Sequence, residues 1–143
     1  MRIEVDQSGK IEESRNTVIA FSNDEQFTVM MPKQLKNRLL KNTKPKRQAI
    51  YRIFARGVYC CIKDYINKDR QIIIDEEYRK HWSDIKNYLL NDLRKNNPHF
   101  NKKLITFRQI SDKSKAHRLA YQTYSNKLKP NRILAEKDFE GLL

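Results

Sequence analysis

Cysteine, glycine, proline and tryptophan are all scarce in this sequence, and each shortage excludes a class of protein. The 143 residues include only 3 glycines, 4 prolines and 1 tryptophan, which is too few for a collagenous or low-complexity chain. The two cysteines, Cys60 and Cys61, are adjacent, so they are poorly placed for a mutual disulfide and match no zinc motif. Because they also fall within a helical pattern, we expect buried thiols in a reducing, cytoplasmic compartment.

Long hydrophobic runs are also missing. No stretch approaches the ~18–20 apolar residues that a membrane-spanning helix needs. The first residues alternate apolar side chains with Arg2, Glu4 and Asp6, which is unlike the apolar region of a secretory signal. We therefore expect neither a signal peptide nor a membrane partner, and the length predicts one domain able to form a core without disulfides.

Positive charge is abundant and unevenly distributed. Lys and Arg total 30 against 17 Asp and Glu, a net charge of +13. There is no acidic residue between Glu25 and Asp64, and we interpret this segment as a track for the phosphates of DNA or RNA, with solubility alone as the alternative. The basic residues that we predict to bind nucleic acid are Lys33, Lys36, Arg38, Lys41, Lys44, Lys46, Arg47, Arg52 and Arg56.

Apolar periodicity predicts strands at 1–6, 17–22, 27–31, 71–75 and 104–110, and helices at 33–41, 47–66, 80–95 and 113–127. The first three strands have tight connections and should form an antiparallel meander. Each later strand follows a helix and should add in parallel through a right-handed crossover. We therefore predict an α/β domain over residues 1–130, with a five-stranded mixed sheet and helices on both faces. Residues 131–143 form a tail that either docks or is disordered, and a docking tail offers a contact for a protein partner or a homodimer.

Two carboxylates end predicted strands. Asp6 closes the first strand, and Asp75 follows the run Ile72-Ile73-Ile74, which is typical of a strand buried on both faces. If these strands are parallel neighbours, their ends lie about 4.8 Å apart, and two such carboxylates suit Mg²⁺ or Mn²⁺. The alternative for each Asp is a turn former or helix cap.

Further ligands are within reach of this edge. Glu76 and Glu77 follow directly, and either one adds a metal ligand or faces solvent. His117 lies at the boundary of the buried face of the last predicted helix. It is either a third member of the site or a packed or surface histidine.

The sequence around these residues resembles the ribonuclease H-like superfamily of nucleases. Residues 72–78, Ile-Ile-Ile-Asp-Glu-Glu-Tyr, are similar to its fourth-strand motif, in which an Asp follows a hydrophobic run and an aromatic residue comes three positions later. Residues 115–120, Lys-Ala-His-Arg-Leu-Ala, are similar to its last-helix motif, in which a catalytic acid or His precedes x-Leu-Ala. Residues 6–9, Asp-Gln-Ser-Gly, match its first-strand Asp and small polar turn. The resemblance spans about residues 1–128 and includes the predicted order of elements.

This resemblance implies a nuclease that hydrolyses phosphodiester bonds. Its catalytic set is Asp6, Asp75 and His117, and its ligands for Mg²⁺ or Mn²⁺ are these three together with Glu76. One departure concerns the start of the first long helix, where cellular ribonucleases H carry a Glu and this chain has Arg47, Gln48 and Arg52. The departure disfavours cleavage of RNA–DNA hybrids and leaves junction, flap and single-strand cleavage open. The alternative is a non-catalytic relative that binds nucleic acid or a protein partner.

Overall fold

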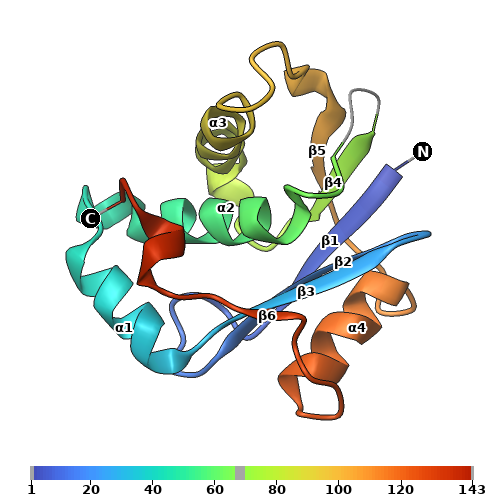
Figure 1. Ribbon diagram of the computed structural model, residues 1–143, viewed down its shortest axis with the longest axis horizontal. Helices are drawn as coiled ribbons and strands as arrows, with labels where there is room; N and C mark the ends of the chain where they lie inside the picture. The colour runs from blue at the N-terminus through green and yellow to red at the C-terminus, as the bar shows by residue number, and fades with distance from the viewer. Residues whose placement is uncertain (1, 67–69, 143) are drawn as a thin grey trace.

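A mixed β-sheet forms the centre of the molecule (Figure 1). The computed structural model describes residues 2–66 and 70–142, and within these ranges the sheet has six strands. They are β1 (Arg2–Ser8), β2 (Thr17–Ser22), β3 (Gln26–Met31), β4 (Gln71–Asp75), β5 (Ile105–Arg108) and β6 (Arg132–Ile133). Met1 and Leu143, which begin the first predicted strand and end the predicted tail, lie outside the described residues.

The strand order is β5-β4-β1-β2-β3-β6. Strands β1, β2 and β3 are antiparallel neighbours, whereas β4 is parallel to β1 and β5 is parallel to β4. The predicted antiparallel meander with two parallel additions is therefore confirmed.

The predicted number of five strands is wrong, because β6 pairs in parallel with β3 at the far edge. Two residues are too few to show an alternating pattern. Asn131 holds this segment in place, since its side-chain oxygen accepts a hydrogen bond from the Thr28 amide at 2.9 Å and its own amide donates to Thr28 Oγ1 at 2.8 Å.

Helices cover both faces of the sheet, as predicted. They are α1 (Lys33–Asn42), α2 (Ala49–Ile62), α3 (Trp82–Leu93) and α4 (Lys115–Tyr124). Figure 1 shows α2 and α3 on one side of the strands and α4 on the other. Strand β2 is buried along its whole length for this reason. Its residues Ile19 and Phe21 belong to the core beneath α2, and Val18 and Ala20 pack with α4.

Glycine allows α2 to lie close to the sheet. A Cβ atom at Gly57 would lie 2.7 Å from Cδ1 of Ile19 and 2.8 Å from the methyl group of Met31. Helix α2 is shorter than the predicted helix over 47–66, because residues 46–48 form a separate 3₁₀ turn and residues 63–65 form a turn after Ile62. In the described parts of the chain, no helix has the length and apolar character that crossing a membrane requires.

The segment after α4 returns to the core. Leu134, Phe139 and Leu142 are buried in the main hydrophobic cluster. The buried guanidinium of Arg56, on α2, forms an ion pair with Asp92 at 2.9 Å and donates to the backbone oxygen of Asp138 at 3.0 Å. This arrangement fixes residues 131–142 against α2.

Candidate functional site

Asp6 and Asp75 lie next to each other at one edge of the sheet. Strands β1 and β4 run in parallel with Val5 opposite Ile74, so the two aspartates are the next residues along neighbouring strands. Both line one cleft of about 480 Å³. The structure thus brings together two carboxylates that are 69 positions apart in the sequence.

His117 reaches the same cleft from α4, which packs on the face of the sheet that carries Asp6 and its strand partner Ala20. Helix α4 begins after Ser114, whose hydroxyl oxygen accepts a hydrogen bond from the His117 amide at 3.0 Å. This cap places the His117 side chain in the first turn, with its Nδ1 atom 2.9 Å from Oδ2 of Asp6. The imidazole remains 42% exposed, whereas the Asp6 side chain is only 5% exposed. His117 therefore joins a buried carboxylate to the solvent in the cleft.

The two aspartates differ in what stabilises their charges. Burial raises the pKa of Asp6, while the hydrogen bonds from His117 and from the Gln7 amide at 2.8 Å oppose that rise. Burial also raises the pKa of Asp75 to about 6, and the Ile110 amide, which donates to its Oδ1 at 3.0 Å, opposes it. The negative charge of Asp6 raises the pKa of Asp75 further. Because the pair repels, a cation placed between the two carboxylates would be stabilised.

Two more carboxylates and two cations surround this pair. Glu76, a predicted ligand, lines the cleft but is paired with Arg79. Glu77 also lines the cleft, and its Oε1 lies 3.2 Å from Nζ of Lys10. Our sequence analysis missed Lys10 and Arg79. The signal for Lys10 was its place directly after the Ser8-Gly9 turn, four residues beyond Asp6.

As arranged in residues 2–66 and 70–142, no three His, Cys, Asp or Glu side chains form a group that could hold a metal ion by themselves. The chemistry of the Asp6–Asp75 pair nevertheless fits a small divalent cation. Mg²⁺ is usually bound by one or two carboxylates and completes its shell with water and substrate phosphates rather than with a full protein cage. Each carboxylate also has more lone pairs than its observed hydrogen bonds use.

Burial divides the predicted nucleic-acid-binding residues into two groups. The exposed group comprises Lys33, Arg38, Lys41, Lys44, Lys46 and Arg47; of these, Arg38 forms an ion pair with Glu136 at 3.2 Å. Arg52 is partly buried and donates to the backbone oxygens of Lys44 and Gly141. Lys36 and Arg56 are buried and bonded within the protein, so neither faces a ligand and both fall outside the surface that we predicted. Apolar periodicity alone does not reveal the burial of Lys36, because a lysine can occupy an inward position where oxygen atoms accept hydrogen bonds from its ammonium group.

Comparisons with known proteins found no matching family model, no similar curated protein and no similar solved structure. The function must therefore follow from the arrangement of this chain's own residues.

Proposed function

We propose that this protein is a divalent-metal-dependent nuclease with a ribonuclease H-like fold. The observation that carries the proposal is the meeting of Asp6, Asp75 and His117 in one cleft, from two parallel strands and the last helix. The order of elements along the chain supports it, because three antiparallel strands are followed by two parallel strands that alternate with helices, as the resemblance in the sequence implies. The sixth strand adds to the edge farthest from β5.

Asp6 and Asp75 would hold Mg²⁺ or Mn²⁺, and Glu76 would join them after releasing Arg79. When bound, such an ion activates water for in-line attack and stabilises charge on the phosphate and the leaving oxygen. In the protein itself, the Ile110 amide fixes the orientation of the Asp75 carboxylate. Burial of Asp6 and Asp75 lowers the local dielectric constant and strengthens their attraction for a cation.

His117 has the geometry of a proton carrier. Its contact with Asp6 fixes the ring orientation, and its partial exposure gives it access to water in the cleft. An imidazole nitrogen can accept a proton from water or donate one to a leaving oxygen.

Binding of the substrate backbone would use the exposed cations. Lys33 and Lys41 lie on α1, and Lys44, Lys46 and Arg47 follow it in the chain. Contacts of this kind bind phosphates without reading bases, so we expect affinity that falls with salt and depends little on sequence.

The proposal is tested by a cleavage screen with single-stranded, flap and junction substrates of DNA and RNA, with Mg²⁺, with Mn²⁺ and with a chelator. We expect cleavage that requires the metal ion and that falls at least a hundredfold in Asp6→Asn and Asp75→Asn, with substrate binding retained. Asp24→Asn is the matched control, because Asp24 is exposed in the turn between β2 and β3. Cleavage by Asp75→Asn at the parental rate would contradict the proposal.

One observation favours a second candidate, a module that binds nucleic acid without cutting it. The carboxylates of Asp6 and Asp75 both accept hydrogen bonds within the protein, as purely structural aspartates would. This candidate predicts that a chelator leaves oligonucleotide binding unchanged and that no divalent ion elicits cleavage.

A further inference from the structure

The connection between β1 and β2 borders the cleft. Residues 9–16, here called the rim loop, begin at Gly9, which has a φ of +79°. A Cβ atom at Gly9 would lie 2.3 Å from the backbone oxygen of Asn16, so only glycine permits the turn that starts the loop. The loop then presents Lys10 to the cleft.

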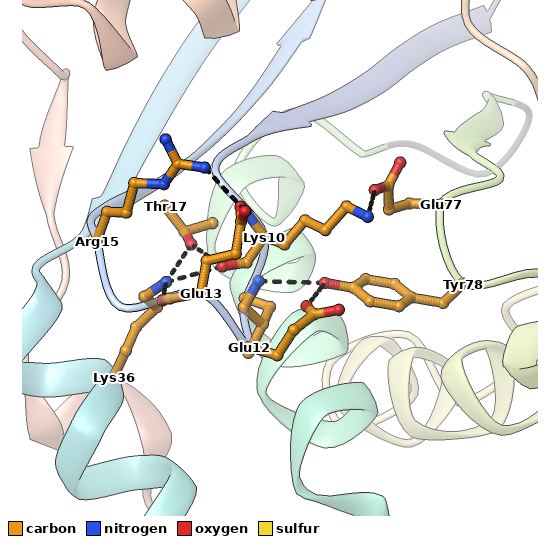
Figure 2. A network of polar contacts seen from close by, with 9 residues as sticks. Lys10, Glu12, Glu13, Arg15, Thr17, Lys36, Glu77 and Tyr78 are labelled. Atoms are coloured by element: carbon orange, nitrogen blue, oxygen red, sulfur yellow. Dashed lines mark hydrogen bonds and ion pairs between the residues drawn. The ribbon is translucent and has the colours of Figure 1, made fainter.

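Lys36, on α1, extends into this loop, and Figure 2 shows its ammonium group among the oxygen atoms of the loop. The side chain is fully buried. Its Nζ atom donates to the backbone oxygen of Glu13 at 2.7 Å, to that of Lys10 at 2.9 Å and to Thr17 Oγ1 at 2.9 Å. Thr17 in turn donates to the Lys10 oxygen at 3.3 Å.

The number of hydrogens on the ammonium equals the number of acceptors. A charged lysine has three N–H donors, and three oxygen atoms from the loop and the start of β2 receive them. A buried ammonium is tolerated only where it is fully hydrogen-bonded. Removal of the amine would take one donor from each backbone oxygen. The Lys10 oxygen would keep the Glu13 amide at 3.1 Å and the Glu13 oxygen the Arg15 amide at 2.9 Å, so the loop would lose these hydrogen bonds to α1 while its internal ones remain.

The opposite side of the loop is attached to the residues after β4. The amide of Ile11 donates to the Tyr78 hydroxyl oxygen at 3.2 Å, and that hydroxyl donates to Glu12 at 3.1 Å. Lys10 makes its ion pair with Glu77 on the same side. Figure 2 shows these contacts extending from α1 on the left to Glu77 and Tyr78 on the right. Lys36 and Tyr78 therefore hold the loop from its two sides.

We propose that Lys36 is a positioning residue that fixes the rim loop and so holds Lys10 at the edge of the cleft, where Lys10 binds a phosphate of the substrate. The part of this inference that concerns substrate depends on the proposed function. The Lys10 ammonium is half-exposed and bound to a single carboxylate, so exchange of Glu77 for a phosphate oxygen costs little. The same exchange would free Glu77 inside the cleft.

The first test is amide hydrogen exchange, which needs neither substrate nor metal. Lys36→Met keeps the length of the aliphatic part of the side chain and removes the ammonium. We expect the Ile11 amide to exchange at least tenfold faster in this variant, while amides paired between β2 and β3 keep their rates. Gln34→Met, at an exposed position of the same helix, is the control and should exchange like the parent. An unchanged Ile11 rate in Lys36→Met would overturn the proposal.

A second variant guards against misfolding of Lys36→Met. Thr17→Val preserves the shape of the buried side chain but removes one acceptor from Lys36 and the donor to the Lys10 oxygen. We expect the same acceleration at Ile11, about threefold. A folded Thr17→Val with parental exchange at Ile11 would also overturn the proposal.

The second test asks whether Lys36 acts through Lys10. Binding of a fluorescent single-stranded oligonucleotide is measured without metal for Lys10→Met, Lys36→Met and the double variant. We expect each single variant to bind three- to tenfold more weakly and the double variant to bind no more weakly than the worse single one, since coupled residues are not additive. Lys102→Met removes an exposed charge before β5, at the other end of the strands, and controls for net charge.

If the loss of affinity in the double variant equals the product of the two single losses, Lys36 does not act through Lys10. Failure of the parent to bind any oligonucleotide would contradict the proposed function, and hydrogen exchange would then decide the role of Lys36.

Discussion

The Nδ1 atom of His117 lies 2.9 Å from Oδ2 of Asp6, and this contact joins the first turn of α4 to β1 across 111 positions of sequence. It gives the buried aspartate a partner that can carry a proton. Asp75, the neighbouring aspartate, accepts a backbone amide instead. The two carboxylates therefore differ in their partners although they share one cleft.

The charged carboxylate of Asp75 should make the metal-free protein less stable at neutral pH than at pH 4. Its pKa rises to about 6 in the folded protein, against about 3.9 in an unfolded chain. The folded state therefore binds more protons between these values, so the contribution of Asp75 to stability is complete below about pH 3.9 and is lost as the pH rises through about 6.

We expect Asp75→Asn to remove this loss and to unfold with a free energy about 1–2 kcal/mol higher than the parent at pH 7, after allowance for solvent screening. The advantage should disappear near pH 4. Urea unfolding at a series of pH values measures it, with Asp24→Asn as the control. A variant that is less stable than the parent at pH 7 would count against the raised pKa of Asp75 in the folded protein, which is due first to burial and then to the charge of Asp6.

Lys36 should have the opposite dependence on pH. Burial lowers its pKa to about 8, the charges of Glu13 and Glu12 oppose that shift, and Arg15 adds to it. The unfolded value is about 10.4, so the unfolded chain binds more protons between these values. The contribution of Lys36 to stability is complete above about pH 10.4 and is lost as the pH falls through about 8.

We therefore expect the stability of the parent, relative to Lys36→Met, to increase from pH 8 to pH 10. The loss of one hydrogen from the amine is outweighed by removal of the buried charge. Denaturant unfolding of both proteins over this range gives the difference. A stability difference between the two proteins that stays constant from pH 8 to pH 10 would contradict the lowered pKa of Lys36.

Ser114 should control the position of His117 through the start of α4. Its hydroxyl oxygen caps the helix by accepting the His117 amide, and loss of such a cap costs about 1 kcal/mol. We expect Ser114→Ala to lose this stability and to cleave several-fold more slowly, because the first turn carries the imidazole. Ser83→Ala, at an exposed position in the first turn of α3, should change neither property. Thermal unfolding and initial cleavage rates provide the two readouts.

The central sheet was predictable because its strands have clear patterns. Ile72, Ile73 and Ile74 form an uninterrupted apolar run, and β4 is indeed buried between β1 and β5. Strand β6 was not predictable, since Arg132–Ile133 is too short for a pattern and depends on the side chain of Asn131.

The site was only partly predictable for a related physical reason. Asp6 and Asp75 are marked by their positions at the ends of strands, so their meeting follows from the topology. The burial of Lys36 depends on where the backbone oxygens of a loop lie, which no periodicity encodes. Likewise, the ion pair of Lys10 with Glu77 joins two loops whose paths the sequence does not specify.

The most direct test of the central claim, that Asp6 and Asp75 together hold a divalent cation, is the melting temperature as a function of Mn²⁺ concentration. A ligand that binds only the folded state stabilises it in proportion to the logarithm of its concentration, once that concentration exceeds the dissociation constant. We predict that millimolar Mn²⁺ raises the melting temperature of the parent and of Asp24→Asn by several degrees, and that Asp6→Asn and Asp75→Asn show no rise. Equal rises in all four proteins, or none in the parent, would contradict the claim.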